Sequence, residues 1–232
     1  MDRGTIQWSE RLIMWYSGLM PFCGRLVLWA AATGLWFVSC VGASPVLVED
    51  RDYGLVNGAV WVRGPWAAIQ PSADIDAVID QLCPAVMELP RAQGREYGQE
   101  YCGVLYSVGD GAYSASMPSP LGPLLKATPE QQKSCKQPNF VRDSRGAVKI
   151  QADYHSHPWA NSRMSRPDRA EARQRYSIRL QFDTACRVMK LVPYIGEARP
   201  GEVYERRGKS WALIGIVKPE HKATGLMTAV TE

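Results

Sequence analysis

Residues 147–157 read AVKIQADYHSH and decide the expected fold, because their side chains alternate between two sets. One set is Val148, Ile150, Ala152 and Tyr154, and the other is Lys149, Gln151, Asp153, His155 and His157. Successive side chains of a β-strand point to opposite faces of its sheet. The stretch is therefore predicted to be a strand with both histidines on one face and mostly apolar residues on the other.

The two histidines have the spacing of a metal clamp. His155 and His157 lie about 6.6 Å apart along an extended strand, at about 3.3 Å per residue, and their rings can close on one ion. Asp168 is the candidate third ligand, because it sits in the first turn of an expected helix, where the helix dipole favours a carboxylate. Ser165 and Asp168 also have the spacing of a capping box, which would explain both residues without any metal.

Outward from this strand, helical and extended patterns are mixed. Residues 72–89 place Ile75, Val78, Ile79 and Leu82 at helical spacing, with Ser72 as the expected N-cap and a bend expected near Pro84. Residues 100–108, a turn at 109–111 and residues 112–117 predict a β-hairpin, which a long loop over 118–146 follows. A helix is expected to begin in 165–177, and further strands over 189–195, 201–207 and 210–217. Because strands and helices do not alternate regularly, the expected class is α+β.

The N-terminal part predicts export. An apolar run after Arg25 is typical of a signal peptide, so residues 1–43 are expected to be an export signal. Three outcomes stay open: cleavage after Ala43, which the small residues there favour, acylation at Cys40 with lipid anchoring, or retention as a membrane anchor. Residues 44–71 are interpreted as an extended lead-in, 72–217 as the main domain and 218–232 as a polar tail. The expected location is the periplasm or cell envelope, or outside the cell.

Composition narrows the partners. The 27 basic and 23 acidic residues give a net charge of +4 without a basic run, so we expect no nucleic-acid partner. Four cysteines remain outside the leader, namely Cys83, Cys102, Cys135 and Cys186. In an oxidising compartment they allow two disulfides in any of three connectivities, and their spacings match no paired Cys-x-x-Cys zinc pattern.

His155-Ser156-His157-Pro158, the seven residues 158–164 and Ser165-x-x-Asp168 resemble the motif of the JAMM (MPN+) metalloprotease family. Glu100-Tyr101-Cys102-Gly103 looks like the Glu-x-x-Gly element of that family. The resemblance covers 72–217 and is greatest to a bacterial branch found as domains of Rhs-type polymorphic toxins. It implies a central mixed β-sheet flanked by helices and a peptidase or isopeptidase activity.

The resemblance also implies roles for individual residues. His155, His157 and Asp168 would hold Zn²⁺, Glu100 would be the general base, and Ser165 would donate to the developing oxyanion. Glu96 is an alternative base, but it lacks the following glycine. Cys102, two residues from Glu100, is expected in a disulfide or buried, although it could approach the metal. His221 is expected to be solvated.

The expected substrate is a peptide or isopeptide bond, in an envelope protein or in peptidoglycan. Two further hypotheses keep the same fold. One is a non-catalytic binding or scaffold protein, and the other is a secreted toxin-type effector that uses the same chemistry.

Overall fold

The computed structural model describes residues 51–123, 133–170, 174–192 and 197–230. The chain divides into two units, Met1–Leu47 and Val48–Glu232, and the described residues belong to the second. The expected export signal over 1–43 lies outside the described residues. Within the described ranges, no helix is both long enough and apolar enough to cross a membrane.

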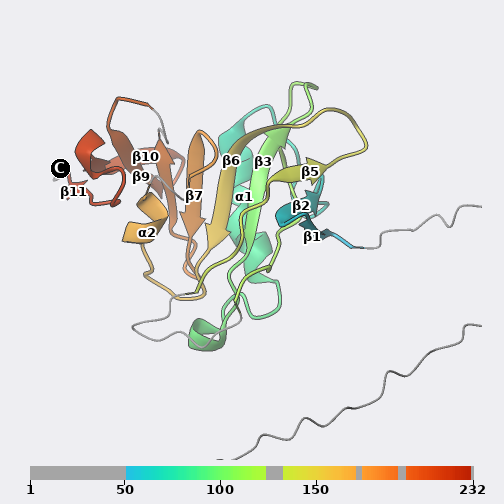
Figure 1. Ribbon diagram of the computed structural model, residues 1–232, viewed down its shortest axis with the longest axis horizontal. Coiled ribbons are helices and arrows are strands. Elements are labelled where there is room, and N and C mark those ends of the chain that lie inside the picture. The colour runs from blue at the N-terminus through green and yellow to red at the C-terminus, as the bar shows by residue number, and fades with distance from the viewer. Residues whose placement is uncertain (1–50, 124–132, 171–173, 193–196, 231–232) are drawn as a thin grey trace, which may run out of the picture. The chain divides into compact units, whose positions relative to one another are not determined.

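The fold is mixed α+β and mostly β (Figure 1). The main sheet has the strand order β11-β10-β9-β8-β7-β6-β3-β4. Its strands are β3 (Cys102–Ser107), β4 (Ser114–Ala115), β6 (Lys149–Ser156), β7 (Ile178–Phe182), β8 (Val188–Val192), β9 (Gly201–Arg207), β10 (Ser210–Val217) and β11 (Thr228–Ala229). The described pairs in this sheet are antiparallel except β6 with β7. The predicted hairpin is β3–β4, and the strands predicted over 201–207 and 210–217 are β9 and β10.

Helix α1 (Ile75–Met87) covers one face of the sheet and lies behind β3 and β6 in Figure 1. Its apolar side chains pack against that face in one buried cluster, which includes Val78, Ile79, Leu82, Leu105, Ala152, Tyr154, Leu180 and Phe182. The predicted helix is thus confirmed, but its N-cap is Asp74 rather than Ser72. The Asp74 carboxylate accepts the N–H of Asp76 at 3.0 Å, and the helix continues past Pro84.

A β-bulge divides β6 into two parts. Leu105 of β3 lies opposite Ala152, but the next residue, Tyr106, lies opposite Ile150. One extra residue in a strand moves the side chains that precede it to the other face. Ile150 therefore packs with Tyr106 in a second cluster, and the expectation that it shares a face with Ala152 is wrong.

A small second sheet covers this second cluster. It consists of β1 (Tyr53–Val56), β2 (Ala59–Arg63) and β5 (Phe140–Arg142), in the order β1-β2-β5. Val62 and Val141 from it pack with Val104 and Tyr106. Residues 53–63, expected only as an extended lead-in, form the β1–β2 hairpin, and the loop expected over 118–146 contains β5.

The helical expectation after Ser165 is mostly wrong. Helix α2 (Arg166–Arg169) makes a single turn, and Ala170 already has an extended backbone. Residues 171–173 lie outside the described residues, and from Ile178 the chain forms β7, which the pattern analysis missed. In the part of the chain that the structure describes, α1 is the only helix longer than one turn. The other helical elements there are the short turns η1 (Arg95–Tyr97), α2 and η3 (Pro219–His221).

Two disulfides join distant elements. Cys83 of α1 bonds to Cys186, which lies between β7 and β8. Cys102 of β3 bonds to Cys135, in the segment before β5. The two disulfides that these four cysteines allow are both present, and of the three possible connectivities the structure has Cys83–Cys186 with Cys102–Cys135.

Candidate metal centre

Strand β6 brings the His pair to the face of the sheet opposite α1. His155 lies opposite Cys102 on β3 and opposite Gln181 on β7. His157 follows the strand directly, and its N–H donates to the carbonyl of Phe182 at 2.8 Å, which continues the ladder by one residue. The two side chains are only 5% and 7% exposed, so this part of the sheet buries polar groups.

Asp168 meets both histidines. Its carboxylate oxygens lie 3.5 Å from Nε2 of His155 and 3.4 Å from Nε2 of His157. One potential ligand atom from each of the three residues lies within 4.8 Å of the other two. The three expected metal ligands therefore lie together, although a strand and a separate helical turn supply them.

A capping box holds the turn that carries Asp168. The Ser165 hydroxyl accepts the N–H of Asp168 at 3.3 Å, and the Asp168 carboxylate accepts the N–H of Ser165 at 3.0 Å. The Ser165 hydroxyl also donates to Oδ2 of Asp168. The capping box suggested by the spacing is present, and the same carboxylate faces the imidazoles.

The ionisation of these groups is mutually dependent. Burial alone would raise the pKa of Asp168, but the two histidines hold that pKa well below its usual range. Burial alone would lower the pKa of His157, yet the carboxylates of Asp168 and Glu100 outweigh it and raise that pKa. The site therefore favours the ionised carboxylate of Asp168 and positive charge close to it.

His157 has a partner on its other nitrogen. Its Nδ1 lies 2.8 Å from the Ser162 hydroxyl, and the Ser162 N–H donates to the buried Asp183 carboxylate at 3.0 Å. When Nδ1 carries the proton and donates to Ser162, the lone pair of Nε2 points toward Asp168. Metal-bound histidines usually have such a partner on the second nitrogen.

His155 gives the observation that tests the fit of a metal. Its Nδ1 is buried without a hydrogen-bond partner among the described residues, and the only polar contact of its buried Nε2 there is the Asp168 carboxylate 3.5 Å away, which is too long for a good hydrogen bond. A buried polar atom left without a hydrogen bond costs about 1 to 3 kcal/mol, so such atoms usually have a reason to exist. A cation bound at Nε2 would satisfy one of them. Two imidazoles and one carboxylate also form a common ligand set for catalytic zinc, so the residues fit this ion.

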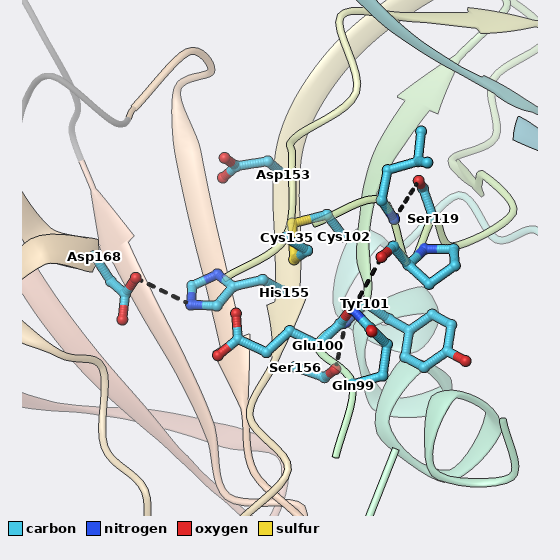
Figure 2. The surroundings of a disulfide bond; sticks show 12 residues. Gln99, Glu100, Tyr101, Cys102, Ser119, Cys135, Asp153, His155, Ser156 and Asp168 are labelled. Atoms are coloured by element: carbon cyan, nitrogen blue, oxygen red, sulfur yellow. Dashed lines mark hydrogen bonds and ion pairs between the residues drawn. A yellow bond between two sulfur atoms is a disulfide. The ribbon is translucent and has the colours of Figure 1, made fainter. Parts of the chain in front are cut away.

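Glu100 reaches the same pocket from the residue before Tyr101. Figure 2 shows its carboxylate beside the ring of His155, on the side where Asp168 lies. The side chain is 5% exposed and lines a pocket of about 420 Å³ together with His155 and Asp168. The alternative base, Glu96, lies half-buried in η1 and does not line this pocket.

The backbone that follows Glu100 is tied to β6. The N–H of Tyr101 donates to the hydroxyl of Ser156, and the N–H of Ser156 donates to the carbonyl of Tyr101, each at 3.0 Å. Gln99 donates through its side-chain amide to the carbonyl of Glu100 at 2.9 Å. Glu100 is thus fixed in register with the His pair.

Gly103 has a steric role in this register. It lies opposite Tyr154, and a Cβ added at Gly103 would come within 2.2 Å of the tyrosine ring. The ring fills the space that a side chain would take, and its hydroxyl donates to the carbonyl of Ser116 at 3.1 Å. The glycine of the Glu-x-x-Gly element is required here by packing.

Other expected residues lie as follows. Cys102 lines the pocket but is held in its disulfide, as preferred from the sequence. His221, expected to be solvated, is instead half-buried in η3, and it is not part of the metal cluster among the described residues.

Three residues that support the site were not predicted from the sequence. Ser162 lies in the spacer between the motif's histidine and serine, and Arg179 and Gln181 lie on the missed strand β7. Arg179 forms a buried ion pair with Asp153 at 2.8 Å. The alternation of residues 147–157 places Asp153 on the same face as the histidines. Nothing else in the sequence pointed to its ion pair with Arg179.

Comparison of the chain with protein-family models, with curated proteins and with solved structures gives no match. The function of the site is therefore inferred from its own residues.

Proposed function

We propose that this chain is an exported zinc-dependent peptidase or isopeptidase of the JAMM type. The observation that carries the proposal is the convergence of His155, His157 and Asp168, with potential ligand atoms within 4.8 Å of one another, in a pocket that Glu100 also lines. Metal ligands and a nearby carboxylate base are the minimum set for hydrolysis by activated water.

The three ligands would hold Zn²⁺ through Nε2 of each imidazole and the Asp168 carboxylate. Bound there, zinc would act as a Lewis acid and make water a nucleophile near neutral pH. Because protein ligands of catalytic zinc usually number three, one position would remain for water or substrate.

Glu100 would accept the proton of the attacking water and deliver it to the departing amine nitrogen. Such general acid–base catalysis typically contributes about 10² to 10⁴ in rate. The hydrogen bonds that fix Gln99 and Tyr101 keep the carboxylate at the pocket, so little ordering is needed before reaction.

Ser165 would donate its hydroxyl to the substrate oxygen as negative charge develops there. In this structure the hydroxyl donates to Asp168. It therefore has to exchange this acceptor for the substrate oxygen, and its loss should impair turnover more than metal binding.

The order of elements supports the likeness to JAMM proteins. Helix α1, the glutamate before β3, the β3–β4 hairpin, β6 with the His pair and the Ser165–Asp168 turn follow one another along the chain as that family's elements do. Among the described residues the chain has one long helix, α1, and a second sheet, β1-β2-β5.

The location and the substrate follow from less direct observations. Two disulfides favour an oxidising compartment outside the cytoplasm. A substrate met there would be a peptide or isopeptide bond of the cell envelope.

A digest of peptide and muropeptide libraries with the zinc-loaded protein tests the proposal. The wild type should cleave, and a chelator should abolish cleavage. Glu100→Gln should keep its zinc and lose cleavage. Full cleavage by Glu100→Gln, or cleavage that resists the chelator, would contradict the proposed mechanism.

A further inference from the structure

The pocket beside the metal centre has a cationic wall. Four basic side chains line it together with Glu100 and Asp168, namely Lys133, Lys136, Arg175 and Arg179. Arg179 is neutralised by its buried ion pair with Asp153. Lys133 is buried, so Lys136 and Arg175 are the two basic side chains that the wall exposes.

Lys136 and Arg175 form the accessible part of this wall. Both are exposed, and within the described ranges neither side chain takes part in an ion pair or a hydrogen bond. Basic side chains on a surface are usually solvated, but these two share a concave pocket with a proposed reaction centre. In such a concave, charge-lined site, attraction for an anion is stronger than on an open surface.

The wall is held rigidly against the metal centre. The disulfide between Cys102 and Cys135 fixes the residue next to Lys136 to β3, and Figure 2 shows this bond near His155 and Glu100. The N–H of Lys136 also donates to the carbonyl of Leu121 at 2.6 Å.

A second hydrogen bond brings Arg175 to the same place. The hydroxyl of Tyr176, the next residue, donates to the carbonyl of Pro138 at 2.8 Å. The segment that carries Lys136 and the one that carries Arg175 are therefore tied together. Because the backbone at both positions is anchored, the two cations lose less entropy on binding one anion than side chains on independent segments would.

We propose that Lys136 and Arg175 bind a carboxylate of the substrate, on a residue adjacent to the scissile amide. This inference rests on the proposed hydrolase function, because an amide placed between Glu100 and Asp168 brings only its neighbouring residues to the cationic wall. The substrate class is thus a peptide with a free carboxylate next to the cleaved bond, either a C-terminal α-carboxylate or an acidic side chain.

Binding to the inactive Glu100→Gln chain tests this without any turnover. Calorimetry compares four N-acetylated tripeptides: Ala-Ala-Ala as the free acid, the same peptide as the carboxamide, and carboxamides that end in Glu or in Gln. At least one charged peptide should bind about tenfold or more tightly than its neutral partner, the size of one charge-assisted hydrogen bond. The pair that differs identifies which carboxylate is bound.

Charge-matched variants supply the control. In the Glu100→Gln background, Lys136→Gln/Arg175→Gln should remove the preference for the charged peptide. Lys209→Gln/Lys218→Gln removes the same net charge from exposed positions that do not line the pocket and should retain the preference.

Equal affinity for charged and neutral peptides, or no measurable binding, would overturn the carboxylate site. Retention of the preference in the Lys136/Arg175 variant would overturn it as well. Cleavage by the wild type is scored separately. An absence of cleavage in the library digest would contradict the proposed hydrolase function. The binding comparison tests only whether Lys136 and Arg175 bind a carboxylate.

Discussion

The guanidinium of Arg179 lies 2.8 Å from the carboxylate of Asp153, and about 1% of each side chain is exposed. A second nitrogen of Arg179 donates to the backbone carbonyl of Asp168 at 3.0 Å. The Arg179–Asp153 ion pair joins the parallel strands β6 and β7. Through Arg179 it also connects them to the turn that carries Asp168, the third proposed ligand.

Replacing Arg179 should affect both stability and metal binding. Arg179→Met leaves the Asp153 charge buried without a partner, so the free energy of unfolding should fall by about 3 to 5 kcal/mol, measured by urea denaturation. Asp153→Leu/Arg179→Met should recover most of this stability, but its zinc affinity should stay low because the Asp168 carbonyl still lacks its donor. Wild-type zinc affinity in the double variant would show that Arg179 does not position Asp168.

Ser162 should raise the zinc affinity of the site through its contact with His157. Ser162→Ala removes the group that faces Nδ1, and partners of this kind are worth about 10- to 100-fold in metal affinity. Competition with a chromophoric chelator measures the change. Ser144→Ala, at an exposed turn, is the control and should bind zinc as the wild type does. Unchanged affinity in Ser162→Ala would refute this role.

Gly103 should tolerate no side chain. Gly103→Ala forces a methyl group against the ring of Tyr154. We expect a loss of about 1 to 3 kcal/mol in the free energy of unfolding, as for other overpacked cores. Gly146→Ala is the matched control, because an added Cβ there would meet nothing closer than 3.9 Å. Equal stability of the two variants would contradict this account of the glycine.

Asp143 should give the protein a defined acid response. Burial alone would raise the pKa of Asp143, but hydrogen bonds from Arg145 and Tyr106 outweigh it and lower that pKa. Its stabilising effect is then complete above the unfolded-state pKa of about 3.9 and is lost as the pH falls through the lower folded-state pKa.

Urea denaturation between pH 3 and pH 7 measures this effect as the difference between the wild type and Asp143→Asn. The difference should stay constant above about pH 5 and shrink below about pH 4. A difference that does not change with pH would show that the Asp143 carboxylate is not stabilised in the folded state.

The local part of the site could be predicted from the sequence. Alternation around His155 and His157 predicts one shared face, and the Ser165–Asp168 spacing predicts the cap that orients the carboxylate. Periodicity also predicts α1, because its apolar positions follow one stripe. These features depend on residues close together in the chain, where spacing alone fixes geometry.

The rest depends on tertiary contacts. The bulge that turns Ile150 away from Ala152 has no local signal, because it arises from pairing with β3. Strand β7 was missed although Ile178, Leu180 and Phe182 alternate, since the preceding residues suggested a longer helix. The position of Lys136 depends on which cysteine bonds to Cys102, and spacing left that choice open.

Zinc content tests the central claim most directly. The protein is incubated with zinc, dialysed and measured by mass spectrometry of the metal, with circular dichroism to verify folding. The wild type and Glu100→Gln should each retain about one zinc per chain, and His157→Ala and Asp168→Asn should retain almost none. A folded wild type that retains no zinc, or equal zinc in the ligand variants, would contradict a metal site formed by His155, His157 and Asp168.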